Sequence, residues 1–252
     1  MLHSLALNRK ISREQKTAIR KFLNPIAALA PTHKLETLAV IHGTDKLGHG
    51  YISQYAKYFG PIRNRKLNVL EIGVGGYQDP KAGANSLRMW QAYFPNSMIY
   101  ALDIYDKRYH EDRRIKIFQG SQNDPEFLNW MADRIGRLDV IIDDGSHVSE
   151  HVRTSFKTLF PRLASPGIYA IEDLHTSYLP EFGGDAENFD TAATSMVLLK
   201  DLIDSVNYQY IPGRTPTVNI DGSVQSLHVH PKLAFIFKGD NTHRFDGIID
   251  EH

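Results

Sequence analysis

The sequence has no cysteine among its 252 residues. This absence excludes disulfides, thiolate metal sites and cysteine nucleophiles, and it fits a reducing compartment, so we expect a cytoplasmic protein. The chain also has no apolar run near the roughly 18 residues that a membrane span needs, and residues 1–20 lack the apolar core of a signal peptide. We therefore expect neither a membrane span nor secretion.

The chain has no surplus of charge of either sign, because Lys+Arg and Asp+Glu both total 29. A nucleic-acid substrate usually requires a basic face, so this balance argues against RNA or DNA as a partner. The hydrophobic share of 42% is ordinary for a globular protein. The length suits one sizeable α/β domain, with two small domains as the alternative.

Apolar runs alternate with amphipathic stretches from Lys66 onward, as in a parallel α/β sheet. Compact apolar runs predict buried strands at 67–73, 98–104, 114–120, 138–144 and 167–173. Helical spacing predicts helices at 85–94, 125–135, 147–163 and 188–206. Two more strands, 224–230 and 233–239, are joined so tightly that they must be antiparallel. We predict a Rossmann-like, doubly wound sheet, mostly parallel, with one antiparallel strand in a C-terminal hairpin.

The residues before this sheet predict a helical cap. Apolar residues at helical spacing predict helices at 12–30, 32–42 and 51–59, with a Gly-rich turn at 43–50. Ser12 and Thr32 are candidate N-caps, and Pro25 is expected to break or kink the first helix. We expect residues 1–60 to form this cap and turn, and residues 61–252 to form the ligand-binding domain.

The first predicted strand contains Glu71 and enters a turn that holds Gly73 and Gly75. Such glycines let backbone N–H groups approach a ligand where α/β sheets bind ligands, although an ordinary tight turn is the simpler interpretation. A dinucleotide fingerprint would need a third glycine at position 78, which is Gln78, so the alternative of an NAD-dependent oxidoreductase is disfavoured. Glu71 suits a cationic ligand, such as the ammonium and sulfonium of S-adenosylmethionine.

Two later strand ends complete this predicted cofactor site. Asp103 ends the second strand, where a carboxylate accepts hydrogen bonds from ribose hydroxyls, as it also would in an NAD site. Gln122 or Asn123, after the third strand, is placed to contact an adenine ring. Asp124 is either part of that contact or the N-cap of the next helix. Together with strand order, these residues favour an adenosine-containing cofactor over an ordinary tight turn that binds no ligand.

Acidic pairs end the fourth and fifth predicted strands, Asp143-Asp144 and Glu172-Asp173. These strands are neighbours in a sheet of order 3-2-1-4-5, so the carboxylates converge and repel one another unless a cation is present. Mg²⁺ prefers carboxylate and water oxygens. Because successive residues on a strand face opposite ways, Asp143 and Asp144 need not both reach the metal. We predict Asp144 as a metal ligand, with Glu172 and Asp173 from the next strand. The alternative is that these acidic residues only cap helices or lie solvated in loops.

Histidines follow both acidic pairs. His147 lies three residues after Asp144, and a neutral imidazole there can accept a proton from a hydroxyl that a metal holds. His175, two residues after Asp173, is the second candidate for this role. A metal-dependent hydroxylase is the other alternative, but a non-heme iron site uses two histidines and one carboxylate, whereas carboxylates dominate here.

Six motifs together resemble one family: GTDKLGHGY at 43–51, VLEIGVGGY at 69–77, SLRMW at 86–90, DPEFL at 124–128, IIDDGSH at 141–147 and IEDLHTSYLPEFGG at 171–184. This is the family of metal-dependent sugar O-methyltransferases. It includes the macrolide deoxysugar enzymes of the mycinamicin and tylosin type and shorter mycobacterial enzymes that methylate mannose or rhamnose. With about forty residues before the first motif, the chain is similar to the shorter members.

The resemblance implies a class I methyltransferase fold that uses S-adenosylmethionine and Mg²⁺ to methylate a sugar hydroxyl of a glycoside, polysaccharide or glycosylated natural product. It gives the metal role to Asp144, Glu172 and Asp173, and the general-base role to His147. It also implies that the turn with Thr44 and Lys46 closes over the cofactor. We further assign Ser86 and Asp143 to the cofactor site, and His175 and Tyr178 to the acceptor. The expected partner is a small-molecule or oligosaccharide acceptor, with a homo-oligomer possible.

Overall fold

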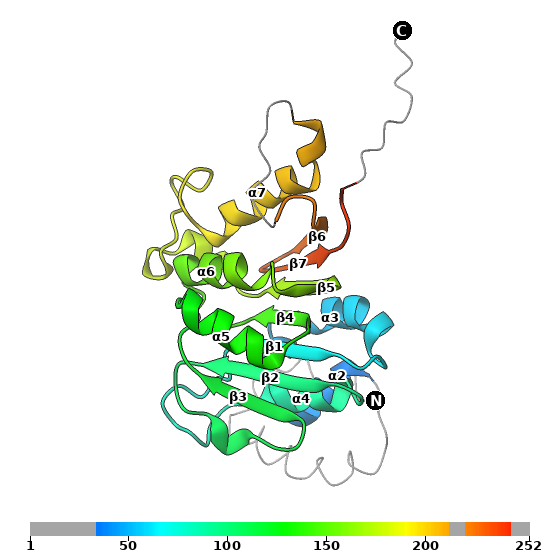
Figure 1. Ribbon diagram of the computed structural model, residues 1–252. Helices are drawn as coiled ribbons and strands as arrows, with labels where there is room; N and C mark the ends of the chain where they lie inside the picture. Colours follow the sequence, from blue (N-terminus) through cyan, green and yellow to red (C-terminus); the bar gives the residue numbers. More distant parts are fainter. Residues whose placement is uncertain (1–33, 212–219, 243–252) are drawn as a thin grey trace, which may run out of the picture.

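A computed structural model of the chain describes residues 34–211 and 220–242 (Figure 1). Its strands are β1 (Asn68–Ile72), β2 (Met98–Asp103), β3 (Ile115–Gln119), β4 (Leu138–Asp143), β5 (Leu163–Ile171), β6 (Val224–His230) and β7 (Leu233–Lys238). Its α-helices are α2 (Leu35–His42), α3 (Ile52–Phe59), α4 (Asn85–Tyr93), α5 (Pro125–Ile135), α6 (Ser149–Leu159) and α7 (Ser195–Val206). Short 3-10 helices are η2 (Asp45–Leu47), η3 (Gly60–Ile62), η4 (Arg108–His110), η5 (Leu174–Tyr178), η6 (Pro180–Phe182) and η7 (Tyr208–Tyr210).

The strands form one sheet of order β3-β2-β1-β4-β5-β7-β6. Strands β1 to β5 pair in parallel, whereas β7 pairs antiparallel with both β5 and β6. Figure 1 shows β3 and β6 at the two edges and β4 near the centre. The predicted sheet, mostly parallel with one antiparallel strand in a C-terminal hairpin, is confirmed. The order also places the ends of β1, β4 and β5 side by side.

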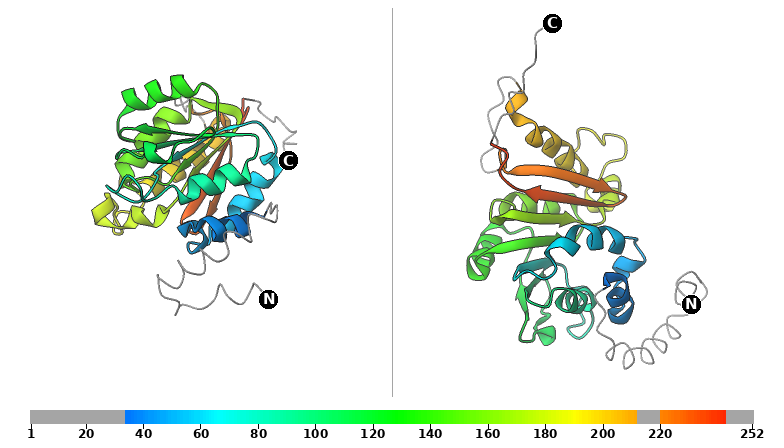
Figure 2. Two further views of the ribbon diagram at one scale, coloured as in Figure 1. Left: turned by 90° about the horizontal axis from the view of Figure 1, so that it is seen from below. Right: turned by 90° about the vertical axis from the view of Figure 1, so that its right-hand side faces the viewer.

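The core lies in two layers because alternate residues of each strand point to opposite faces of the sheet. One layer packs α2, α3 and α4 against the sheet, with Tyr55, Trp90 and Phe235 fully buried in it. The other layer packs α5, α6 and α7 against the opposite face, around Phe156 and Tyr169. Figure 2 shows the sheet between these two sets of helices. Within residues 34–211 and 220–242, every helix is too short or too polar to traverse a lipid bilayer.

Two predicted helices begin later than the sequence pattern suggested. Helix α6 begins at Ser149 rather than at 147, because His147 has a φ of 58°, which a right-handed helix does not allow. Helix α7 begins at Ser195 rather than at 188, where the Thr194 side chain caps it by accepting a hydrogen bond from the Val197 amide. Asp124 caps α5 in the same way, so that N-cap prediction is confirmed.

The predicted N-terminal cap is described only in part. The expected helix at 12–30, with Ser12 and Pro25, lies outside the described residues, as does the candidate cap Thr32. Helix α2 begins at Leu35 and has no side-chain cap hydrogen bond. Residues of α2 and α3 share the core layer of α4 and the sheet. The domain boundary at residue 60 stays a prediction.

Gly73 joins the turn after β1 to the end of β4. Its φ is +95°, and an added Cβ would lie 2.2 Å from the backbone oxygen of Asp144. The Asp144 amide in turn donates a hydrogen bond to the carbonyl of Ile72 at 3.0 Å. Gly75 also has a positive φ, +76°, but nothing lies within 4 Å of its added Cβ. Gly73 is therefore needed for close backbone approach, whereas Gly75 borders open space.

We expect Gly73→Ala to lower the free energy of unfolding by about 3–5 kcal/mol, because a clash with Asp144 adds to the cost of a left-handed alanine. Gly75→Ala is the matched control and should cost only about 1–2 kcal/mol, since it has the backbone cost without the clash. Urea unfolding of the two variants and the unmodified protein measures the difference. Equal losses in both variants would show that the close contact at Gly73 contributes nothing to stability.

Candidate active site

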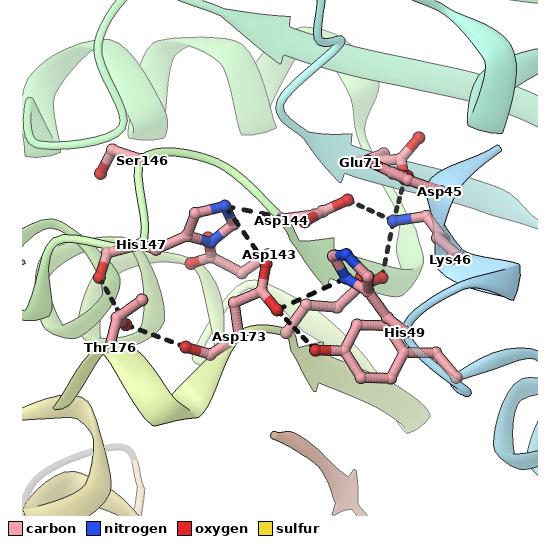
Figure 3. A network of polar contacts seen from close by, with 12 residues as sticks. Asp45, Lys46, His49, Glu71, Asp143, Asp144, Ser146, His147, Asp173 and Thr176 are labelled. Carbon is pink, nitrogen blue, oxygen red and sulfur yellow. Dashed lines mark hydrogen bonds and ion pairs between the residues drawn. The ribbon is translucent and has the colours of Figure 1, made fainter. Parts of the chain in front are cut away.

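A buried ammonium group joins three carboxylates from three strand ends. Lys46, on η2, is 1% exposed. Its Nζ lies 3.1 Å from Oε1 of Glu71 on β1 and 2.7 Å from Oε1 of Glu172, which follows β5. The same Nζ also contacts Oδ2 of Asp144, which follows β4 (Figure 3). The predicted loop over the cofactor thus places its lysine inside the acidic cluster, and Thr44 supports it by accepting a hydrogen bond from the Lys46 amide at 3.4 Å.

The charges of this cluster depend on one another. Burial lowers the pKa of Lys46, but the carboxylates of Asp144, Glu172 and Glu71 raise it more, and the net shift is upward. Burial raises the pKa of Glu71 and holds that of Glu172 well above its ordinary value, where the charge of Asp144 adds to the effect. One ammonium therefore compensates the cluster incompletely, which leaves it receptive to another cation.

Asp173 lies at the centre of the second half of the site. Tyr51 donates a hydrogen bond to its Oδ1 at 2.5 Å, and Nδ1 of His49 lies 3.6 Å from the same oxygen. Its Oδ2 lies 3.6 Å from Nε2 of His147, which is itself 4.0 Å from Oδ1 of Asp144. Figure 3 shows the His147 ring facing both carboxylates, while the Thr176 hydroxyl donates hydrogen bonds to the backbone carbonyls of His147 and Asp173.

Asp144, His147 and Asp173 each offer one ligand atom, and these atoms all lie within 4.8 Å of one another. The structure thus brings together two of the three predicted metal ligands and the predicted base. Both His147 and Asp173 have positive φ, 58° and 53°, so the backbone turns sharply to aim these side chains at each other. The cluster can hold a divalent cation, or it can move a proton at His147.

Glu172, the third predicted metal ligand, is outside this close group and faces Lys46. Its Oε1 accepts hydrogen bonds from Lys46 Nζ at 2.7 Å and from Tyr55 at 2.6 Å. Its Oε2 is buried and has no hydrogen-bond partner among the described residues. A buried carboxylate oxygen without a donor is costly, and a metal ion nearby would remove that cost. The donor set of this site therefore fits Mg²⁺.

Asp143 faces away from the other carboxylates. Its side chain accepts hydrogen bonds from Ser155, Gln122 and Tyr169. Burial raises its pKa to about 6, although the hydrogen bonds from Ser155 and Gln122 oppose that shift. The Gln122 amide oxygen accepts a hydrogen bond from the Ser146 amide at 2.7 Å. Asp143 and Gln122 were both predicted to contact the cofactor. In the structure they help to fix the loop that carries His147, and their cofactor contacts stay predictions.

The remaining predicted cofactor residues line the ends of β1 and β2. Glu71 accepts hydrogen bonds from Ser86 at 2.7 Å and from the Trp90 indole at 3.2 Å. Asp103 accepts hydrogen bonds from the backbone amides of Val74 and Tyr105, each at 2.9 Å. Asp103 thus holds the glycine turn in place beside the carboxyl end of β2.

The two predicted acceptor residues, His175 and Tyr178, lie on η5 at the exposed rim of the acidic cluster. The side chain of His175 is 45% exposed, and its Nδ1 lies 3.9 Å from Oδ1 of Asp173. Tyr178, at the end of η5, is 38% exposed. Neither makes a close contact inside the cluster, so both remain predictions for the acceptor side.

Three residues of the site were not predicted from the sequence: His49, Tyr51 and Tyr55. Tyr51 is the N-cap residue of α3 and Tyr55 lies within the helix, four residues later, so the two side chains project toward the same side. A signal existed, because His49 and Tyr51 belong to the GTDKLGHGY motif. The contacts of that segment depend on how α3 packs on the sheet, which periodicity does not specify.

The sheet order, with β7 antiparallel next to β5, together with the acidic site at the strand ends, defines a class I methyltransferase fold. A solved structure of MycE methyltransferase from the mycinamycin biosynthetic pathway, in complex with Mg, SAH and mycinamycin VI, has a TM-score of 0.80 with this chain. The two are 45% identical, and the match covers 83% of this chain and 54% of that chain. The predicted fold class is thereby confirmed.

Curated relatives confirm the resemblance to sugar O-methyltransferases. The chain is 47% identical over 211 residues to the 8-demethyl-8-alpha-L-rhamnosyl tetracenomycin-C 2'-O-methyltransferase of Streptomyces olivaceus. This match covers 82% of this chain and 55% of the relative. It is 46% identical to the mycinamicin VI 2''-O-methyltransferase of Micromonospora griseorubida, over 82% of this chain and 53% of the relative. No family model matches. Over about four-fifths of its length, the chain is a homologue of these sugar O-methyltransferases, and it spans about half their length.

We expect the raised pKa of Asp143 to appear as a pH dependence of stability. The folded state holds this proton more tightly than the unfolded chain, so the stability that it contributes is present below about pH 4 and is lost as the pH rises through about 6. The difference between about 6 and the ordinary 3.8 corresponds to at most about 3 kcal/mol.

Asp143→Asn removes this titration, so the stability of the variant relative to the unmodified protein should rise by up to about 3 kcal/mol between pH 4 and pH 7. Urea unfolding of both proteins across this range measures it. Curves that stay parallel would mean that Asp143 titrates normally.

Proposed function

We propose that the protein transfers a methyl group from S-adenosylmethionine to a sugar hydroxyl in a reaction that depends on Mg²⁺. The observation that carries the proposal is the convergence of Asp144, His147 and Asp173, whose ligand atoms lie within 4.8 Å of one another after two adjacent parallel strands. The two relatives named above are sugar O-methyltransferases, and MycE was crystallised with Mg and SAH. These similarities support the proposal, although this chain spans about half the length of those proteins.

Two groups of residues would hold the ligands. Asp144, Asp173 and the free Oε2 of Glu172 would hold Mg²⁺, while Glu71 and Asp103 would face the cationic and ribose parts of S-adenosylmethionine. When bound, the metal would stabilise negative charge on the acceptor oxygen, and S-adenosylmethionine would supply the methyl group.

His147 is the residue that we assign to proton transfer. Its Nε2 accepts the proton of the acceptor hydroxyl, and the adjacent carboxylates of Asp144 and Asp173, at 4.0 and 3.6 Å, stabilise the imidazolium that forms. The hydrogen bond from Thr176 to the His147 carbonyl, 3.0 Å long, fixes the loop that aims the ring. The remaining rate enhancement comes from holding the acceptor in line with the methyl group.

The acceptor is proposed to be a small glycoside, an oligosaccharide or a glycosylated natural product, which approaches from the rim formed by His175 and Tyr178. These side chains are partly exposed and next to Asp173 or on the η5 segment that follows it. The cytoplasmic location and the homo-oligomer expected from the sequence stay predictions.

We expect isothermal titration calorimetry to show binding of S-adenosylhomocysteine, because Glu71 and Asp103 suit its ammonium and ribose, and no binding of NADH. Methyl transfer to a panel of free and aglycone-linked rhamnosides and mannosides should stop with EDTA and return with Mg²⁺. Binding of NADH in place of S-adenosylhomocysteine would overturn the methyltransferase proposal, and activity that ignores EDTA would remove the metal from it.

His147→Ala should lower turnover by about 10²- to 10⁴-fold, since general-base catalysis contributes about that much. Its affinity for S-adenosylhomocysteine and for Mg²⁺ should stay unchanged, because the base is not assigned to hold either one. The proximity of His147 to both carboxylates also suits a metal ligand, so a loss of Mg²⁺ affinity in calorimetry would reassign it. His151→Ala is the matched control and should remain active, because His151 lies on α6 and its Nδ1 contacts the Ser146 hydroxyl at 2.8 Å.

A further inference from the structure

Within the described residues, each carboxylate of the proposed metal site has one oxygen that contacts Lys46, Tyr51 or Tyr55 and a second oxygen that contacts none of these three side chains. Lys46 contacts Oδ2 of Asp144, while Oδ1 faces His147 at 4.0 Å. For Glu172, Oε1 accepts both of its hydrogen bonds and Oε2 accepts none from the described residues. For Asp173, Oδ1 accepts the Tyr51 hydrogen bond and Oδ2 faces His147 at 3.6 Å. The same division occurs three times.

The donors that produce this division all come from one short segment. Lys46 is on η2, Tyr51 is the N-cap residue of α3, and Tyr55 lies within α3. All three precede the carboxylates of the proposed metal site by about 100 residues or more. All three side chains are at most 1% exposed. A buried side chain has little freedom, so these donors restrict the rotation of the carboxylates that they contact.

We propose that Lys46, Tyr51 and Tyr55 are positioning residues for the metal site. Their contacts hold one oxygen of each carboxylate and would leave the second oxygen for the cation. The proposal rests on the proposed function, because it takes Asp144, Glu172 and Asp173 as the residues that hold Mg²⁺. In this assignment, Lys46, Tyr51 and Tyr55 touch neither the metal nor the methyl acceptor.

The physical reason lies in the repulsion among the carboxylates. Without donors, each carboxylate would rotate away from its neighbours, and binding a cation would have to restore the arrangement. Hydrogen bonds to one oxygen hold the carboxylate in place and leave the other for the metal. Partners of this kind typically change metal affinity by about 10- to 100-fold when they are removed. The segment 46–55 is thus part of the metal site although it supplies no ligand.

The test measures Mg²⁺ affinity by calorimetry in the absence of any acceptor. Tyr51→Phe and Tyr55→Phe each remove one hydroxyl and leave the ring that packs in the core. We expect each to weaken Mg²⁺ binding about 10- to 100-fold. Tyr58→Phe is the matched control on the same helix, because the Tyr58 hydroxyl contacts His228 and His230, at 3.1 and 2.9 Å, away from the carboxylates. Its Mg²⁺ affinity should match that of the unmodified protein.

Three further readouts make the outcome unambiguous. Tyr55→Phe should keep its affinity for S-adenosylhomocysteine, because the Tyr55 hydroxyl bonds to Glu172 and not to Glu71. Lys46→Met should weaken Mg²⁺ binding as well, and Lys46→Arg should recover part of it. Thermal unfolding without metal identifies any variant that is simply unstable. If the Lys46 variants are unstable, the two phenylalanine variants decide the question, because they keep the ring that packs in the core.

The proposal is overturned if both phenylalanine variants bind Mg²⁺ as tightly as the unmodified protein, or if Tyr58→Phe is weakened equally. Those results would leave the proposed function intact, since the unmodified protein would still bind Mg²⁺ and S-adenosylhomocysteine. An unmodified protein that binds neither would overturn the proposed function itself, and this inference with it.

Discussion

The site depends on the compensation of buried negative charge at the ends of three parallel strands. Parallel strands end at the same edge of a sheet, so the acids at the ends of β1, β4 and β5 meet there whether or not their charges favour it. One ammonium, that of Lys46, contacts all three groups. Because it is a single positive charge among several carboxylates, it compensates the negative charge of the cluster only in part.

This constraint explains why the helices before the sheet matter to the chemistry. Helices α2 and α3 pack on the same face as α4 and fill the core layer there. In doing so, they carry η2 and the tyrosines of α3 to the strand ends. The site therefore joins two parts of the chain: the strand ends supply the acids and the N-terminal segment supplies the donors. Neither part forms the cluster alone, which links the packing of the first described helices directly to the geometry of the site.

Much of the fold and part of the site follow from the sequence. The strands were predictable because each is a compact apolar run, and the tight join between β6 and β7 allows only an antiparallel pair. Asp144 and Asp173 were predictable because strand ends converge. The orientation of Glu172 was not, because the direction of a side chain depends on donors from a distant segment. The starts of α6 and α7 were also missed, since a positive φ at His147 and a cap at Thr194 are local features that helical spacing does not reveal.

The left-handed backbone at His147 and Asp173 has a consequence for how the sequence can change. A histidine or aspartate in that conformation costs the fold about 1–3 kcal/mol, a cost that glycine would not carry. Substitution by glycine at either position would relieve the backbone and remove the side chain that faces the cluster. Stability and chemistry therefore favour different residues there. In a homologue that no longer needs the side chains of this cluster, glycine at these two positions would increase stability. Substitutions there would therefore mark a loss of function earlier than changes in the core.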